Sequence, residues 1–522
     1  MSTPEQHPWL QLEALAARRG DDPALIFPER NRRLSFMQWR GLSLRLAGGL
    51  LALGLKPGDH IGLLAENRIE WPVVQLAVAA MGGVLVPLNT FFRHDDLGFA
   101  LRQSQSKAVI LSREFRSNPY LDHVQALRPT LPQLAHIICL DNAPEVMLLD
   151  DILSEADLPA RVTLEMSKPA ALLYTSGTTG LPKGALLSHR AMAFVARTAT
   201  LRLGIGESDK WTSMIPLFHC AGCIFNLLGS LSSGACYVGV SHFDPELMFE
   251  IIEGERATIF SGVPTGYHAM LHHPTRVRYD LSTLRGGTCG GAQCNPGMLR
   301  QCAQEFPMPG LAQVYGQTEC ATLFTAAAPD DPDRFETAGL PLPPCELRIV
   351  EPDTGEALAP GEVGEIQGSG PNVMIGYFDD AEASALALTG DRFLRTGDRG
   401  YLTPSGKLVI AGGRLKDMVI RGGENISPAE IEDLLQDHPA VVSAAVFGMP
   451  DEYYGEVVVA ALMLEREITA RELNGFCSQH IAQFKVPIRY YITDVFPLTA
   501  SGKVRKMELK EWAKENRMDV LQ

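Results

Sequence analysis

The first half of the chain alternates between helical and strand-like hydrophobic patterns. Residues 43–55 place apolar side chains at helical spacing, and the short apolar run at residues 60–65 is typical of a buried strand. A glutamine, two glycines and a proline interrupt the apolar stretch Val73 to Leu88, which predicts a buried helix followed by a buried strand, not a membrane span. This alternation predicts α/β units.

Three later apolar runs are each followed closely by glycine or by a hydroxyl side chain. They are residues 257–263, 284–288 and 311–315. In open α/β sheets, ligands collect at such strand ends. We therefore expect part of a ligand site there.

The pattern changes after Asp398. Two sequences typical of helix starts, residues 427–430 and 469–472, combine a capping hydroxyl with a glutamate three residues later. Between them lie two β-rich runs, residues 441–447 and 457–464. This part of the chain therefore predicts a small α+β unit.

The change of pattern predicts two domains. Residues 1–413 would form a large N-terminal domain of α/β subdomains, and residues 414–522 a small α+β C-terminal domain, joined near residues 414–417. The small unit is large enough to be a domain of its own. The predicted fold class is α/β.

Composition narrows the class of protein. Of the 522 residues, 46% are hydrophobic and 20% are charged, which is close to the average for soluble globular proteins. The net charge of −15 and the scattered basic residues argue against nucleic acid as a partner. The amino terminus lacks the basic and apolar regions of a secretion signal. We expect a cytoplasmic protein.

Ten cysteines without a dense spacing pattern indicate reduced thiols. Cys220 and Cys223 form a Cys-x-x-Cys pair, which could be a redox dithiol or half of a zinc site. No second such pair lies nearby, so we interpret both as small side chains in a packed segment.

The stretch Tyr174 to Gly184, YTSGTTGLPKG, is the most informative part of the sequence. It places four Ser and Thr hydroxyls among glycines after an apolar run. The glycines let backbone N–H groups approach a polyphosphate, the hydroxyls donate further hydrogen bonds, and Lys183 adds a cation. The GxxxxGK[ST] pattern is absent, and residues 185–187 look like a strand before a helix capped by Ser188. The stretch predicts a triphosphate-binding loop outside the P-loop NTPase fold.

This stretch resembles the signature of the acyl-adenylate-forming superfamily, which includes acyl-CoA synthetases, adenylation domains of peptide synthetases and beetle luciferases. The resemblance covers essentially the whole chain, with further matches in the family's order: PLFH at 216–219, GGA at 290–292, YGQTE at 315–319, TGD at 396–398, GRLKD at 413–417, GGEN at 422–425 and PLTASGK at 497–503. It implies an AMP-forming acyl-CoA synthetase with a mobile small domain, using ATP, Mg²⁺ and coenzyme A.

The resemblance also implies roles in adenylation, which joins a carboxylate to the α-phosphate of ATP and expels pyrophosphate. Lys503 would bridge the carboxylate and the α-phosphate, and Glu319 would bind Mg²⁺. Asp398 would accept the ribose hydroxyls, supported by Arg414. Gly291, Ala292 and Tyr315 would line the adenine slot. The other nucleotide-binding positions are Thr175, Ser176, Gly177, Thr178, Thr179, Lys183, Gly316 and Thr318. Thr175 is also predicted to be catalytic.

A second step follows from the same resemblance, in which a thiol attacks the acyl carbon after the small domain has swung. Lys416 stands at the hinge position. The pantetheine tunnel would be formed by Gly422, Gly423 and Glu424. His219 would be a gate between this tunnel and the acyl pocket. We include it among the predicted catalytic residues, but not as a general base.

The acyl pocket is expected around His219, Cys223, Asn226, Gly262, Gly286, Gly287 and Thr288. The adjacent glycines of this set remove side-chain volume, which suits a branched, cyclic or longer acyl chain. Arg285 could face a second carboxylate or be an ordinary solvated residue. The identity of the acid stays open.

The sequence leaves alternatives for the thiol that accepts the acyl group and for the function. No segment after Lys503 resembles a carrier domain, which favours CoA; the alternative acceptor is the phosphopantetheine of a separate carrier protein. A luciferase-like oxygenase, a non-catalytic nucleotide sensor and a dinucleotide-dependent oxidoreductase, suggested by glycines at 368–370, are weaker hypotheses. The expected partners are a carboxylic acid, ATP and CoA, with no nucleic acid or membrane span and with a homodimer left open.

Overall fold

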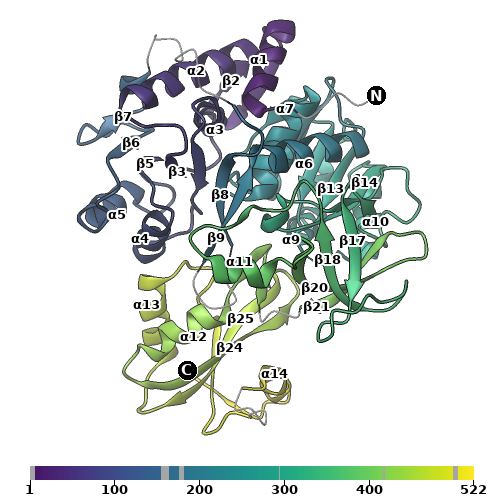
Figure 1. Cartoon of the computed structure of the whole chain (residues 1–522). Helices are drawn as coiled ribbons and strands as arrows, with labels where there is room; N and C mark the ends of the chain where they lie inside the picture. Colours follow the sequence, from purple (N-terminus) through teal and green to yellow (C-terminus); the bar gives the residue numbers. More distant parts are fainter. Residues whose placement is uncertain (1–5, 154–163, 176–181, 293, 415–417, 498–503) are drawn as a thin grey trace. The chain divides into compact units, whose positions relative to one another are not determined.

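Figure 1 shows the computed structural model of the chain, which describes residues 6–153, 164–175, 182–292, 294–414, 418–497 and 504–522. The chain divides into two compact units. The first comprises Met1–Thr90, Ala100–Tyr174 and Gly184–Gly413, and the second Phe91–Phe99, Thr175–Lys183 and Arg414–Gln522. The last change of unit along the chain falls between Gly413 and Arg414.

A nine-stranded sheet lies in the described part of the first unit. Its order is β16-β15-β14-β13-β12-β10-β11-β1-β2; the strands from β14 to β1 pair in parallel, and β2, β15 and β16 pair antiparallel at the edges. The three apolar runs that end at glycine or hydroxyl residues are confirmed as the neighbours β12, β13 and β14. The bounds are β1 Pro23–Phe27, β2 Arg32–Ser35, β10 Lys210–Ser213, β11 Cys236–Val238, β12 Ile259–Gly262, β13 Gly286–Cys289, β14 Gly310–Tyr315, β15 Thr325–Ala326 and β16 Leu340–Pro341.

An eight-stranded sheet has the order β19-β9-β8-β4-β3-β5-β6-β7 within the described residues. The run Val73 to Leu88 forms helix α3 and strand β4, both buried, as the sequence predicts. The bounds are β3 His60–Leu64, β4 Val84–Pro87, β5 Ala108–Leu111, β6 His136–Cys139, β7 Met147–Leu148, β8 Pro169–Thr175, β9 Lys183–Ser188 and β19 Gly376–Tyr377. A four-stranded sheet has the order β17-β18-β20-β21, with bounds β17 Glu346–Val350, β18 Gly364–Ser369, β20 Leu394–Leu402 and β21 Leu408–Arg414.

Helices cover both faces of the nine-stranded sheet. Successive residues of β12 enter different cores: Ile259 packs in the cluster that contains α2, α3 and α6, and Phe260 in the cluster under α8 and α9. Helix α6 starts at His189 after the capping side chain of Ser188, as predicted. The helices up to residue 413 are α1 Pro8–Arg19, α2 Phe36–Ala52, α3 Glu70–Ala80, α4 His94–Gln103, α5 Tyr120–Leu127, α6 His189–Arg202, α7 Gly229–Ser233, α8 Pro245–Glu255, α9 Pro264–Leu271, α10 Pro296–Glu305, α11 Ala381–Ala387 and the π-helix η4, Ala221–Leu228.

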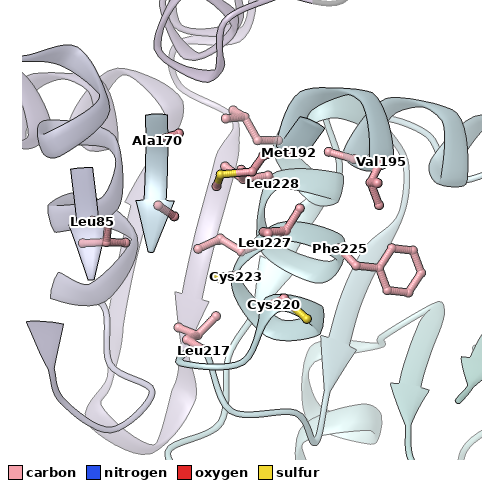
Figure 2. Packing of buried hydrophobic residues seen from close by; sticks show 14 of the residues in the cluster. Leu85, Ala170, Met192, Val195, Leu217, Cys220, Cys223, Phe225, Leu227 and Leu228 are labelled. Atoms are coloured by element: carbon pink, nitrogen blue, oxygen red, sulfur yellow. The ribbon is translucent and has the colours of Figure 1, made fainter. Parts of the chain in front are cut away.

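Cys220 and Cys223 lie in the apolar core. Figure 2 shows them among Leu217, Leu227 and Met192, near the start of η4. Burial raises the pKa of both thiols. All ten cysteines are free, and no group of three or more potential metal ligands occurs in the part of the chain that the structure describes. The interpretation of the pair as small packed side chains is confirmed.

The second unit contains a six-stranded sheet in its described part, with α12 and α13 packed in one apolar cluster and α14 in another. The predicted runs at 441–447 and 457–464 are confirmed as the paired strands β24 and β25. The bounds are β22 Val419–Arg421, β23 Glu424–Ile426, β24 Val441–Asp451, β25 Gly455–Leu464, β26 Arg489–Ile492, β27 Asp519–Val520, α12 Pro428–Gln436, α13 Ala470–His480 and α14 Lys506–Lys514. Among the described residues, no helix has the length and hydrophobicity needed to span a membrane.

One of the two predicted capping boxes is wrong. Thr469 and Glu472 form the reciprocal hydrogen bonds of a box at the start of α13. Ser427 precedes α12, but its side chain makes no capping hydrogen bond. The side chain of Glu430 instead accepts a hydrogen bond from the buried ammonium of Lys485 at 2.6 Å. A tertiary ion pair has displaced the local cap.

Candidate active site

Two segments start at the same edge of the nine-stranded sheet. In the parallel strands β12, β13 and β14, Gly262 lies opposite Cys289, and Cys289 lies opposite Gln313. Residues 290–292 follow β13 and residues 316–319 follow β14, so both leave the carboxyl ends of neighbouring strands. This is the edge at which open α/β sheets bind ligands.

Asp398 on β20 is held by Tyr315 of β14. The Tyr315 hydroxyl donates to Oδ2 of Asp398 at 2.9 Å, and both side chains are buried. Burial and the charge of Asp398 raise the pKa of Tyr315 well above its usual value, so the phenol remains a donor. The sequence placed Tyr315 only in the adenine slot. The structure adds that its hydroxyl orients the carboxylate expected to bind ribose.

Glu319 is held in a similar way by Tyr377. The Tyr377 hydroxyl donates to Oε1 of Glu319 at 2.8 Å, and the backbone carbonyl of Glu319 accepts from the N–H of Met374 at 2.8 Å. Glu319 is only 7% exposed. Burial and the nearby carboxylate raise the pKa of Tyr377. An oriented carboxylate is the type of ligand that Mg²⁺ uses in nucleotide sites, so this residue fits the metal.

The turn that carries Glu319 has a strained backbone. Ala321 and Thr322 have φ of 49° and 101°, and a β-branched residue rarely adopts the second value. Gln317 Nε2 and Thr322 Oγ1 are buried without a hydrogen-bond partner among the described residues. A side chain at Gly316 would clash with the Thr322 carbonyl. Strain and unpaired buried polar groups are costly, and strained residues cluster at active sites and ligand-binding segments.

His219 lies just before η4, and this segment contacts the same turn. Cys220 Sγ lies 3.6 Å from the Thr318 hydroxyl. The ring of His219 lies 4.5 Å from that of Phe218, measured between centroids. The carbonyl of His219 accepts from the N–H of Cys223 at 3.0 Å. π-helical turns occur frequently at functional sites. The role of His219 as a gate beside the reacting groups stays a prediction.

Residues 286–288 line a small cavity that is partly open to solvent. Its apolar wall is formed by Leu203, Ile205, Ile259 and Pro329. Ser261 and Thr288 lie in register, so Gly262, the next residue of β12, faces the opposite side of the sheet. A side chain at Gly262 would clash with Met214. The structure therefore does not bring Gly262 to the cavity.

Three other expectations about the acyl pocket change in detail. A side chain at Gly287 would clash with the Phe260 carbonyl, so glycine is needed there for close backbone packing. At Gly286, an added Cβ would lie 3.3 Å from the carbonyl oxygen of Gly310, a tight contact but not a clash, so this is the glycine of the pair at which a side chain fits with a small shift. Arg285 is neither free nor simply solvated, because it forms a two-point ion pair with Asp209 at 2.8 and 2.5 Å.

Two further members of the expected pocket, Cys223 and Asn226, lie on η4 and are buried. Neither polar atom of the Asn226 amide has a partner among the described residues. Burying an amide without a hydrogen bond is costly, so a polar group or a water is expected beside it.

The glycines assigned to the pantetheine tunnel form a hairpin turn. Gly422 and Gly423 connect β22 and β23 with φ of 59° and 89°, as a two-residue hairpin turn of type I′ requires. Glu424 is the first residue of β23. Their role in thiol binding stays a prediction.

Several assigned positions lie outside the described residues: Ser176, Gly177, Thr178, Thr179, Lys416, Lys503 and the side chain of Arg414. Thr175 and Lys183, at the two ends of the predicted phosphate loop, are described: the hydroxyl of Thr175 donates to the carbonyl of Lys183 at 3.4 Å. The sequence analysis missed Tyr377, which lies 58 residues beyond its partner Glu319. No local pattern around Tyr377 marks it.

The family model described as AMP-binding enzyme matches residues 12–378, and the model described as AMP-binding enzyme C-terminal domain matches residues 430–503. The Bacillus subtilis (strain 168) protein YngI, named as an inferred acyl-CoA synthetase, is 36% identical over 526 residues, covering 96% of each chain. A mitochondrial medium-chain acyl-CoA ligase of Bos taurus is 32% identical over 531 residues, covering 96% of this chain and 86% of the relative.

Solved structures show the same fold. A double mutant of o-succinylbenzoate CoA synthetase from Bacillus subtilis, bound to a product analogue, has a TM-score of 0.84 at 30% identity, covering 97% of this chain and 99% of that one. The amide bond synthetase McbA from Marinactinospora thermotolerans has a TM-score of 0.85 at 28% identity, with coverage of 97% and 99%.

These findings agree with the resemblance and with the observed α/β architecture. The chain is an ATP-dependent acid–thiol ligase, which converts a carboxylic acid to acyl-AMP and pyrophosphate and then to acyl-CoA. Its substrates include ATP and CoA, and Mg²⁺ is typical of the family. Since one family model matches more than half of the chain and a second matches the C-terminal part, the chain belongs to the AMP-binding enzyme family, in its acyl-CoA synthetase branch.

Proposed function

We propose that this ligase activates a medium-chain aliphatic carboxylic acid, with Asp398 and Glu319 as the carboxylates that position the nucleotide. The supporting observation is that each carboxylate is buried and oriented by a tyrosine hydroxyl, from Tyr315 and Tyr377 respectively. Asp398 then accepts the ribose hydroxyls, and Glu319 binds Mg²⁺. Preorganised groups of this kind need not rearrange as charge develops.

In the first step, a carboxylate oxygen of the acid attacks the α-phosphorus of ATP, and the bond to pyrophosphate breaks. When bound, Mg²⁺ neutralises charge on the phosphate oxygens. Thr318 and the loop from Thr175 to Lys183 donate to these oxygens, and Lys503 bridges the carboxylate and the α-phosphate. In the second step, the thiol sulfur attacks the acyl carbon, the bond to AMP breaks, and the thiol proton leaves to solvent.

The cavity beside Gly286 holds the acyl tail in this proposal. Its wall is apolar, and the nearby cation Arg285 is already neutralised by Asp209, which favours an alkyl group over a second carboxylate. The cavity itself is a small hollow that is partly open to solvent, so its volume sets no chain length. The medium-chain name of the Bos taurus relative supports the same class.

A panel of acids tests this assignment. Straight-chain acids from two to sixteen carbons, with matched dicarboxylic acids, are compared by pyrophosphate release with ATP and CoA. We expect the highest kcat/KM at intermediate length and little turnover of dicarboxylic acids. A maximum at acetate, or a preference for dicarboxylic acids, would remove the medium-chain assignment.

The acceptor is tested separately. Thioester formation is measured with CoA and with a phosphopantetheine-loaded carrier protein, each supplied with the preferred acid. We expect CoA to be the better acceptor, with the Gly422–Glu424 segment forming its tunnel, His219 the gate and Lys416 the hinge for movement of the small domain. Higher kcat/KM with the carrier protein would favour the alternative acceptor.

A further inference from the structure

Two cysteines lie in contact on either side of the segment assigned to the adenine slot. Cys289 is the last residue of β13, and Cys294 lies just before α10. The thiol of Cys294 is 3.6 Å from the sulfur of Cys289 and 3.6 Å from the carbonyl oxygen of Ala292. Cys289 is completely buried, whereas Cys294 is partly exposed. Cys294 is therefore the more exposed residue of the pair, and the Cys289 sulfur is held against its thiol.

Gly290, the residue that follows Cys289, is tightly packed. A Cβ at Gly290 would lie 2.7 Å from the carbonyl oxygen of Val314, so this end of the segment is pressed against β14. Gly291 has φ of 80°, a conformation that glycine adopts without strain. A disulfide requires an S–S distance of about 2.05 Å, so the sulfurs must approach by about 1.5 Å. Since Cys289 is buried and Gly290 is tightly packed, we expect Cys294 to move, together with Ala292, whose carbonyl its thiol contacts.

We propose that Cys289 and Cys294 form a reversible disulfide that closes the adenine slot and switches off ATP binding. The inference rests on the proposed nucleotide site, because it takes Gly291 and Ala292 as the wall of that slot. It concerns a modification of this chain and goes beyond the ligase reaction. Disulfides in reducing compartments are usually transient and redox-sensing, which suits a bond of this kind.

The oxidant is hydrogen peroxide. The Cys294 thiolate attacks one peroxide oxygen, the S–O bond forms, the O–O bond breaks and hydroxide leaves, which gives a sulfenic acid. The sulfur of Cys289 then attacks the sulfenic sulfur, the S–S bond forms, the S–O bond breaks and water leaves with the Cys289 proton. Overall, two thiols and one hydrogen peroxide give one disulfide and two water molecules. Burial raises the pKa of Cys289, which suits the second thiol better than the first to react.

Peptide mass and ATP affinity test the inference on the full-length protein. Trypsin should release residues 286–300 as one peptide, which contains both cysteines. After treatment with peroxide, we expect this peptide to weigh two hydrogen masses less, and ATP affinity measured by calorimetry to fall at least tenfold. Dithiothreitol should restore both. ATP present during oxidation should slow the loss.

Matched variants separate this pair from other thiols. Cys294→Ser and Cys289→Ala should keep their ATP affinity after the same treatment, while Cys302→Ser, which replaces a buried cysteine of α10, should respond like the wild type. A peptide that stays reduced, or a disulfide that leaves ATP affinity unchanged, would overturn the inference. Failure of the proposed function would give a different result. The reduced wild type would then release no pyrophosphate with any acid, whether or not the peptide carries a disulfide.

Discussion

A buried pair of histidines makes the first unit sensitive to acid. The rings of His7 and His189 lie 4.0 Å apart between centroids, and both residues are at most 3% exposed. Burial lowers the pKa of His7 to about 4. Burial, and then the neighbouring His7, lower the pKa of His189 to about 3. Nδ1 of His7 accepts the N–H of Trp9, so protonation at this nitrogen would also break a helix cap.

The sign and size of the effect follow from proton linkage. In the unfolded chain each imidazole binds a proton as the pH falls below about 6.5, whereas in the folded chain both stay neutral until about pH 4 and 3. Stability is therefore complete above pH 6.5 and is lost as the pH falls below it. Each group costs about 1.4 kcal/mol per pH unit in this window, so lowering the pH from 7 to 5 should cost about 2 kcal/mol per histidine.

Urea unfolding at pH 7 and pH 5, followed by tryptophan fluorescence, measures this loss. Four of the five tryptophans, Trp9, Trp39, Trp71 and Trp211, lie in the first unit and are buried, so the signal mainly reports that unit. The variant His7→Gln keeps a hydrogen-bond acceptor and should lose about 2 kcal/mol less between the two pH values than the wild type. The control His272→Gln changes an exposed histidine and should behave like the wild type. An equal loss in His7→Gln and the wild type would refute the argument.

Four further variants test the site. Tyr377→Phe removes the hydroxyl that donates to Glu319. Loss of this hydrogen bond to a charged group should cost about 1.5–3 kcal/mol and raise the magnesium concentration that pyrophosphate release requires. An unchanged magnesium titration would contradict the role of Tyr377. Gly286→Val should fill the cavity and shift the preferred acid to shorter chains, with wild-type kinetics for ATP, and an unchanged chain-length profile would exclude the cavity as the acyl site. Lys503→Ala should slow acyl-AMP formation by roughly 10²- to 10³-fold yet still form thioester from supplied acyl-AMP. Lys416→Pro should show the opposite pattern, and equal loss of both half-reactions in both variants would mean that one fixed arrangement performs both.

Local patterns predicted the elements that border the site. The alternation of apolar runs predicted β12, β13 and β14, because a buried strand needs only a short apolar segment and a turn signal. The hydroxyl of Ser188 predicted the start of α6 for a similarly local reason, since a cap lies beside the helix that it completes. At residues 427–430 the same reasoning failed. The pattern is present there, but Glu430 pairs with Lys485, which lies 55 residues further along the chain.

The sequence by itself determined the family and the reaction class, because the motifs that carry the chemistry are short, local stretches that can be read directly from the chain. Only the tertiary structure decided that Tyr315 and Tyr377 hold the two carboxylates, that Asp209 neutralises Arg285 and that Gly286 lines a cavity. Tyr315 and Asp398 are 83 residues apart, and Arg285 and Asp209 are 76 apart. Such pairs depend on which strands become neighbours and on which face each side chain takes, and burial of apolar surface over the whole unit drives that arrangement.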